Sequence, residues 1–230
     1  MKGMYDKRME CPICMSPYQT KKILSRFVRV ASLDTDFYSV YENTHLNPLF
    51  YHVNTCPNCG YSHTEDFSPY FPPNAKEQIV QQVCQLWTHQ DYGNERSALK
   101  AINAYKLALY CALLKKEKHV TIAGLLLRIA WLHRLEQQEE EEKRFLLYSL
   151  NEYKLSYETD DFQSSKMTLT KVLYLIGELN RRVGQEHEAA YYFSQIIQRH
   201  AKAGDPQTIE MARDRYQEIR EKQKQEAEVI

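Results

Sequence analysis

The sequence predicts an α+β protein that is mostly α, with a small N-terminal β domain followed by an all-α stack of helix pairs. Two C-P-x-C pairs lie within about the first sixty residues, with strand-like patterns between them. From about residue 74 onward, apolar residues recur three and four positions apart, as in amphipathic helices. We therefore expect a β domain over residues 1–73, helix pairs over 74–203 and a charged C-terminal helix over 204–230.

The four cysteines of these pairs, Cys11, Cys14, Cys56 and Cys59, indicate a metal site. A Zn²⁺ ion binds four thiolates in a tetrahedron at about 2.3 Å, and each C-x-x-C turn brings two sulfurs to one side of the ion. The matching prolines favour two matched turns over a redox-active pair, which usually occurs once beside a βαβ pattern. The sequence therefore predicts a closed, structural Zn²⁺ site, with iron on the same four thiolates as the alternative.

The residue after each cysteine pair is where such a turn often needs a positive φ angle, which glycine adopts most easily. Gly60 has this position in the second pair. Met15 has it in the first, which is acceptable if that turn relaxes. The two other cysteines, Cys84 and Cys111, lie in helical apolar patterns, and we expect them in the core.

Two segments between the cysteine pairs have the pattern of β-strands. Residues 21–32 and 49–56 alternate apolar and polar side chains, and the second segment leads directly into the second pair. Two cysteine turns that each feed a β-hairpin form a zinc ribbon, but a spacing of about forty residues is long for a compact one. We therefore expect residues 33–49 to be an inserted loop, and loops of this length are usually functional or disordered.

The inserted loop and its surroundings raise the question of a second site. Asp34 and Asp36 could bind a hard cation, although two carboxylates on an exposed turn are the simpler interpretation. His45, His52 and His63 could serve a second metal, but four cysteines already suffice for one ion. We expect the histidines to be surface or packing residues.

Capping and turn residues divide the helical region. Asn74 with Glu77 predicts a capping box at the first helix, and Gly93 with Asn94 predicts the end of that helix and the start of the next. The acidic run 139–142 is expected to be a solvated helix start, where carboxylates favour the helix dipole. Apolar stripes predict the later helices around residues 98–109, 122–135, 145–155, 169–183 and 189–197, and Gly204, Asp205 and Pro206 predict the start of a last one that runs to about Glu228.

The helices pair in a pattern similar to tetratricopeptide (TPR) repeats. Residues 173–197 come close to the TPR spacing, and two looser pairs precede them at intervals of about 45 to 47 residues. Three stacked pairs would form a groove lined by the first helix of each pair, whereas an ordinary helical bundle would have none. Aligning the pairs predicts groove residues suited to peptide recognition, namely Gln81, Gln85, Trp131, Arg134, Tyr174, Glu178 and Arg181.

Several motifs occur together in a fixed order along the chain. A C-P-x-C pair, a basic strand, a D-x-D-F segment, an N-P-L-x-Y segment and a C-P-x-C-G-Y segment are followed by helical repeats; they stand at Cys11–Cys14, 21–30, Asp34–Phe37, Asn47–Tyr51 and Cys56–Tyr61. In these motifs the chain resembles a family of uncharacterised bacterial proteins grouped as a domain of unknown function. The resemblance implies a zinc ribbon followed by TPR-like repeats, and it implies no activity. Met15 is the one departure.

Composition and apolar patterning indicate in which cellular compartment the protein is found. The chain has 30 basic and 30 acidic residues, so no overall field attracts nucleic acid or anionic membrane. The N-terminus has no apolar stretch for a signal peptide, and the longest apolar run, residues 121–132, is too short to span a membrane. We expect a cytoplasmic protein without membrane contacts, where thiols stay reduced and favour metal binding.

These observations favour a non-enzymatic, zinc-binding scaffold for protein partners that the sequence does not name. The alternative is a nucleic-acid-binding zinc ribbon that uses its basic strand, although residues 34–73 contain five acids and no Lys or Arg. An enzyme is the third reading. The sequence has no nucleophile, phosphate-loop or zinc-protease motif, and four cysteines leave a zinc ion no open position. In the nucleic-acid-binding alternative, the side chains that would contact phosphates are Lys21, Lys22, Arg26 and Arg29.

Overall fold

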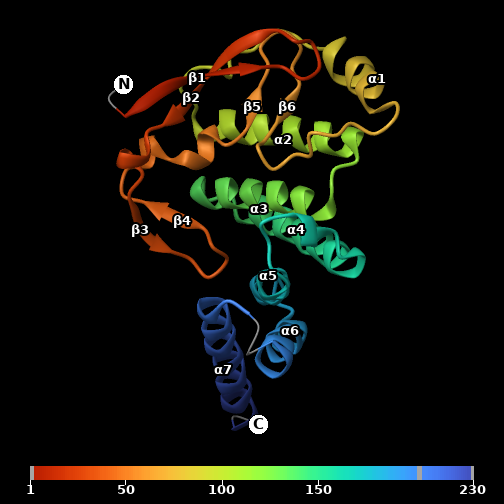
Figure 1. Cartoon of the computed structure of the whole chain (residues 1–230). Coiled ribbons are helices and arrows are strands. Elements are labelled where there is room, and N and C mark those ends of the chain that lie inside the picture. Colours follow the sequence, from red (N-terminus) through yellow and green to blue (C-terminus); the bar gives the residue numbers. More distant parts are fainter. Residues whose placement is uncertain (1–2, 201–203, 229–230) are drawn as a thin grey trace.

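The computed structural model describes residues 3–200 and 204–228, and it confirms a mostly α chain with a small N-terminal β part (Figure 1). Three two-stranded antiparallel sheets pair β1 with β2, β3 with β4 and β5 with β6. The strands are β1 (Met4–Glu10), β2 (Pro17–Ile23), β3 (Val30–Leu33), β4 (Ser39–Tyr41), β5 (Asn54–Thr55) and β6 (Ser62–His63). The α-helices are α1 (Ala75–Ile79), α2 (Ala98–Lys115), α3 (His119–Leu135), α4 (Glu139–Thr159), α5 (Leu169–Arg182), α6 (Glu186–Arg199) and α7 (Pro206–Glu228).

The helices stack in sequence order, from α2 beside the β-hairpins to α7 at the opposite end of the molecule (Figure 1). Each helix from α2 to α6 packs against the next one along the chain. The first of the three expected pairs is incomplete, because α1 is short and continues into a single π-helical turn, Val80–Cys84. Within the described part of the chain, no helix combines the length and the apolar content needed to cross a membrane.

The largest apolar core joins the β part to the helices. Leu49, Phe50 and Tyr51 are buried in the same cluster as the inner faces of α2 to α5. The hydroxyl of Tyr105 in α2 donates a hydrogen bond to the carbonyl oxygen of Leu49 at 3.1 Å. Residues before and after position 73 therefore share one apolar core.

Both strands expected between the cysteine pairs are shorter than the patterns predicted. Residues 21–32 are divided by a 3₁₀ turn, Ser25–Phe27, into the end of β2 and the start of β3. Residues 48–51 form a 3₁₀ helix instead of a strand, and only Asn54–Thr55 pairs as β5. The reason is local: the Asn47 side chain accepts from the Leu49 N–H, and Pro48 begins the turn with its fixed φ angle.

The inserted loop, 33–49, is structured. Its first part completes the β3–β4 hairpin, and 3₁₀ turns over Thr44–Leu46 and Pro48–Tyr51 return the chain to the second cysteine pair. The hairpin lies beside α3, and its tip, residues 34–38, points toward α5 (Figure 1). An insertion between two metal-binding turns thus reaches the middle of the helical stack.

The start of the helical region differs from the prediction. Asn74 has a left-handed backbone and its side chain makes no capping hydrogen bond, so the capping box is absent. Gly93 and Asn94 lie in the connection before α2, and Ser97 caps that helix by accepting from the Lys100 N–H. At the other end, α7 begins at Pro206 as predicted, and Asp205 accepts from the Thr208 N–H at 3.2 Å.

Candidate metal centre and hairpin dock

The two cysteine turns have the same backbone hydrogen bonds. In the first, the N–H of Met15 donates to the carbonyl of Cys11 at 2.9 Å. In the second, the N–H of Gly60 donates to the carbonyl of Cys56, also at 2.9 Å. The backbone N–H of the first cysteine in each pair donates to the carbonyl oxygen five residues later: Cys11 donates to Ser16, and Cys56 donates to Tyr61. The matched prolines therefore do mark matched turns.

The four sulfurs form one compact cluster, with all of them within 4.8 Å of one another. The Sγ atoms of Cys11 and Cys59 are 3.5 Å apart, and those of Cys14 and Cys56 are 3.7 Å apart. A tetrahedron of sulfurs at about 2.3 Å from a central Zn²⁺ has edges of about 3.8 Å, so the donor set fits this ion. The geometry does not choose between zinc and iron.

The ionisation of the cluster also fits a cation. The hydrogen bond with Cys56 raises the pKa of Cys11 to about 12. Hydrogen bonds from Cys11 and Cys59 lower the pKa of Cys56 to about 2. The neighbouring thiols thus stabilise a thiolate at Cys56, and a divalent cation would favour the thiolate form of its ligands further.

The residues after the cysteine pairs both adopt the left-handed conformation, with φ of 58° at Met15 and 76° at Gly60. The first turn therefore does not relax to suit its methionine. A second feature also requires glycine at position 60, because a Cβ atom there would lie 2.3 Å from the ring of Trp87. That ring covers the second turn and donates its Nε1–H to the carbonyl of Pro57 at 2.8 Å.

The two other cysteines have different surroundings. Cys111 is buried in α2, as expected, and its sulfur accepts from the Ser62 N–H at 3.5 Å. Cys84 is only partly buried and ends the π turn that packs against the metal cluster. Burial raises the pKa of Cys84, although a hydrogen bond with Cys59 opposes that shift.

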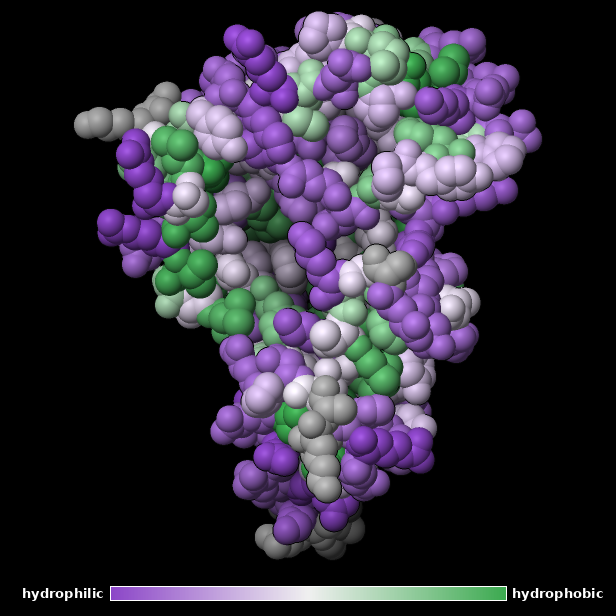
Figure 2. All heavy atoms as spheres, in the orientation of Figure 1, coloured by the Kyte–Doolittle hydropathy of each residue, from purple (hydrophilic) through white to green (hydrophobic). Residues whose placement is uncertain are grey.

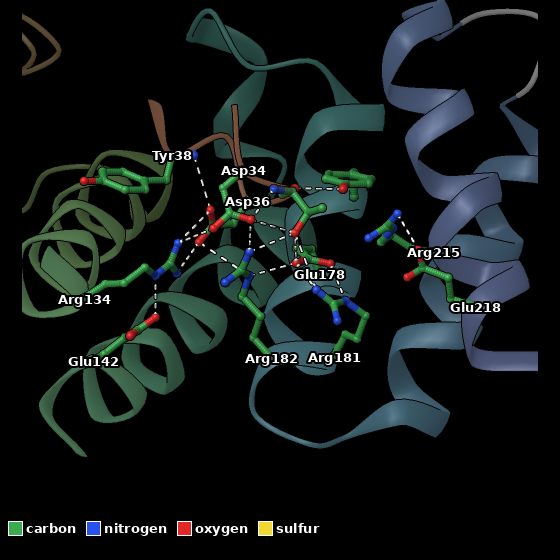
Figure 3. Close-up of polar contacts among 12 residues, drawn as sticks. Asp34, Asp36, Tyr38, Arg134, Glu142, Glu178, Arg181, Arg182, Arg215 and Glu218 are labelled. Carbon is green, nitrogen blue, oxygen red and sulfur yellow. Dashed lines mark hydrogen bonds and ion pairs between the residues drawn. The ribbon is translucent and has the colours of Figure 1, made fainter. Parts of the chain in front are cut away.

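The tip of the β3–β4 hairpin makes the second polar cluster of the molecule, which we call the hairpin dock. It joins residues 34–38 to the facing sides of α3 and α5 (Figure 3). Arg134 of α3 pairs with Asp34 at 2.8 Å and with Asp36 at 2.6 Å. Arg182 of α5 pairs with Asp34 at 2.5 Å. The two aspartates therefore bind guanidinium groups in this fold, and the interpretation as an exposed turn is wrong.

Aromatic groups and a third acidic side chain complete the dock. Trp131 donates its Nε1–H to Asp36 at 3.0 Å, and its ring packs on Tyr38 with centroids 5.7 Å apart. The hydroxyl of Tyr174 donates to the backbone carbonyl of Thr35 at 2.8 Å. Glu178, which is fully buried, pairs with Arg182 at 2.8 Å and with Arg181 at 2.7 Å.

Charge pairing sets the electrostatics of the dock. Burial alone would raise the pKa of Asp34, but Arg182 and Arg134 outweigh it and hold that pKa below its ordinary value. Burial likewise disfavours the charged form of Arg134, but its hydrogen bonds to Asp36 and Glu142 raise its pKa above the usual range. The paired ions therefore stabilise each other in the folded state.

Most of the residues that sequence alignment assigned to a groove do come together here. Trp131, Arg134, Tyr174 and Glu178 contact the hairpin tip directly, and Arg181 pairs with Glu178 beside it. The groove they form is filled by the chain's own hairpin. Gln81 and Gln85 belong to the π turn and its end, beside the metal cluster, and take no part in the dock.

Sequence reasoning missed other members of the dock, which are Thr35, Tyr38, Glu142 and Arg182. Arg182 directly follows Arg181, which the sequence predicts in the groove. The D-x-D-F segment, Asp34–Phe37, was noted only as a possible cation site. What the sequence lacked was any sign that the inserted loop and α5 would meet.

The basic strand offers few unengaged cations. Lys21 pairs with Asp6 at 2.7 Å, and Lys22 donates to the carbonyl of Tyr51 at 2.6 Å. Burial lowers the pKa of Lys22 to about 8. Arg26 lies over the ring of Phe27, and Arg29, which is largely exposed, lies 3.9 Å from Glu42.

The three histidines near the metal centre lie in separate places. His45 is exposed on a 3₁₀ turn. His52 lies 3.3 Å from Asp66, and His63 stacks on Tyr61. Among the residues that the structure describes, the four cysteines are the only group of three or more metal-ligating side chains placed to share an ion.

Fold and site together define a four-cysteine metal-site protein with a stack of antiparallel helices and an inserted hairpin that docks on them. A family model described as "Uncharacterized protein conserved in bacteria (DUF2225)" matches residues 4–219, and the chain therefore belongs to this family. No curated protein and no solved structure matches the chain.

Proposed function

We propose that this protein is a non-enzymatic, cytoplasmic interaction scaffold. In this proposal, the four cysteines hold a structural Zn²⁺ ion that stabilises the N-terminal part. The TPR-like helices then present the facing sides of α3 and α5 to a protein partner. No step of a reaction is assigned to any residue.

One observation carries the proposal: this face already holds a peptide segment. Arg134, Arg182, Trp131 and Tyr174 contact residues 34–38 through charged, indole and hydroxyl hydrogen bonds. Arginine and aromatic side chains are the residues that most often dominate protein–protein recognition. A face built in this way suits peptide binding better than it suits a merely solvated helix surface.

The nucleic-acid alternative receives less support. A phosphate-binding surface needs several cations that are free to neutralise phosphates. Lys21 and Lys22 of the basic strand are engaged within the fold, and only Arg26 and Arg29 extend toward solvent. The acidic residues Asp6 and Glu42 lie beside this strand.

The test is an affinity pull-down from bacterial lysate, treated and untreated with nuclease. The bait is the full chain as wild type, as Arg182→Ala, and as Arg144→Ala, the control, because Arg144 is an exposed arginine on α4. We expect specific proteins that resist nuclease and are lost with Arg182→Ala alone. Equal capture by all three chains would contradict the proposed face, and capture that ends with nuclease would make nucleic acid the partner.

A further inference from the structure

We propose that the hairpin tip is an internal competitor, and that the partner binds the same face through an acidic turn of the same chemistry. This inference rests on the proposed function and adds to it the kind of peptide that the face selects. It follows from how each position of the tip is contacted.

The position of Asp36 selects a carboxylate. This side chain has no exposed surface, and one of its oxygens accepts from Arg134 at 2.6 Å and from Trp131 at 3.0 Å. An amide at this position would remove the most deeply buried of the carboxylates that balance the guanidinium group of Arg134. A ligand of this face therefore needs an aspartate at this point.

Two residues earlier, Asp34 selects a second acid. It bridges Arg134 and Arg182, which come from different helices. Between the two acids, Tyr174 binds the backbone carbonyl of Thr35, while the threonine hydroxyl donates to Glu178 at 2.5 Å. The middle position thus favours a small hydroxyl residue, serine or threonine.

The two positions that follow select aromatic rings. Phe37 packs on Tyr174 with ring centroids 5.3 Å apart, and Tyr38 packs on Trp131. Phe37 has a left-handed φ of 67°, which reverses the chain at the tip. The partner segment is therefore an acidic turn of the form Asp–Ser/Thr–Asp followed by two aromatic residues.

The hairpin can leave without disturbing the other sheets. β3 and β4 pair only with each other, so release of the tip breaks no further strand pairing. All four residues of β3 are exposed, and Val30, Leu33 and Val40 are exposed apolar side chains of the hairpin. Figure 2 shows hydrophobic surface on the flank of the molecule that carries β3 and β4. The tip contacts thus supply most of what holds the hairpin to α3 and α5.

An internal ligand sets the affinity that a partner must exceed. A segment tethered by a short connection acts at an effective concentration on the order of 1 mM. A free peptide with the tip sequence should therefore displace the hairpin from the wild-type chain only near that concentration. Weakening the internal tip should let the same peptide bind at least about ten times more tightly.

The experiment uses a fluorescein-labelled peptide of residues 33–39, LDTDFYS, and the full zinc-loaded chain. The peptide is titrated into the wild type and into the double variant Asp34→Asn/Asp36→Asn, with a scrambled peptide as control. Tip release is followed by NMR in an isotope-labelled chain, through the ring contact between Phe37 and Tyr174, neither of which is substituted; the peptide is unlabelled, and the indole N–H of Trp87, bonded to Pro57, serves as an internal reference.

We expect the contact between the Phe37 and Tyr174 rings to be lost in the double variant, and the peptide to bind this chain at least about tenfold more tightly than the wild type. The proposal is overturned if the tip leaves and the peptide does not bind, if the tip stays docked without its carboxylates, or if an oligonucleotide displaces the peptide equally well. Should the variant fail to fold, millimolar unlabelled peptide must still remove this contact within the wild-type chain. None of these results depends on finding a natural partner, so the proposed function is tested separately.

Discussion

The metal centre and the hairpin dock both fix the N-terminal part of the chain, but they are built on different distances along the sequence. Within each cysteine pair the ligands are three residues apart and one turn positions both. In the dock, Asp36 meets Trp131, 95 residues away, and Asp34 meets Arg182, 148 residues away. The chemistry of a local motif can be recognised from the sequence, whereas the hairpin dock forms only when elements that are distant in the sequence pack together.

The metal centre and the hairpin dock also differ in where their counter-charges come from. The thiolate cluster requires an ion to balance four negative charges. The dock supplies its own counter-charges, because the carboxylates of Asp34, Asp36, Glu142 and Glu178 face the guanidinium groups of Arg134, Arg181 and Arg182. Removing the metal and removing one dock residue should therefore have effects of different size and extent.

The largest effect is expected from Cys56→Ser. Loss of one thiolate removes most of the metal-binding free energy, and stability should fall on the order of 5 kcal/mol. Hydrogen exchange should show lost protection in β1, β2, β5 and β6, while α3 to α6 keep theirs. Metal content is measured by mass spectrometry, with Cys111→Ser as a control that keeps the metal. Full metal content in Cys56→Ser would disprove the four-cysteine site.

Within the dock, Asp36→Ala should cost about 3 kcal/mol, because it leaves buried guanidinium charge poorly compensated. Asp34→Ala should cost about 1 kcal/mol, since that side chain remains a third exposed and water replaces part of the interaction. Urea unfolding of the zinc-loaded proteins gives both values. Equal costs would mean that burial does not rank the two aspartates.

The two tryptophans allow the regions to be compared by the same substitution. Trp131→Phe removes a hydrogen bond to the charged Asp36, at a cost of about 2 kcal/mol. Trp87→Phe removes one to the neutral carbonyl of Pro57, at about 1 kcal/mol. Thermal unfolding measures the difference, and a larger loss for Trp87→Phe would reverse our ranking of the two contacts.

Mild acid should weaken the metal region through His63. Burial lowers the pKa of this imidazole below its usual 6.5 in the folded state. Its stabilising contribution is therefore complete above pH 6.5 and is lost as the pH falls through the folded-state pKa. Between pH 7.5 and 5.5, the unfolding free energy of His63→Gln should fall less steeply than that of the wild type.

The smallest expected effect is at the first cysteine turn. Met15→Gly removes the strain of a left-handed methionine, about 1 kcal/mol, but gives the unfolded chain more freedom. The net gain should be about 0.5 kcal/mol in chemical denaturation. Gly60→Ala should instead destabilise strongly, because its Cβ would overlap Trp87. If both substitutions behaved alike, the two turns would not differ as the structure indicates.

The sequence alone determined the features that depend on short spacing. Two C-P-x-C pairs defined the sulfur cluster, periodic apolar residues defined α2 to α6, and Asp205 with Pro206 defined the start of the last helix. These succeed because a turn or a helix places neighbours in sequence at fixed positions in space. Even so, three local predictions were wrong. Asn74 has a left-handed backbone and does not cap α1, Ser97 caps α2 in place of Asn94, and Asn47 begins a 3₁₀ helix where a strand was expected over residues 49–56.

Only the tertiary structure decided what the inserted loop does. Its acidic residues looked like a solvated turn, and the groove residues looked like an open surface for a partner. Packing of α3 and α5 against α4 brings Arg134 and Arg182 to one place, and their positive charge stabilises Asp34 and a fully buried Asp36 there. No pattern within a single segment encodes that meeting, because burial of an ion depends on the counter-charges that the whole fold supplies.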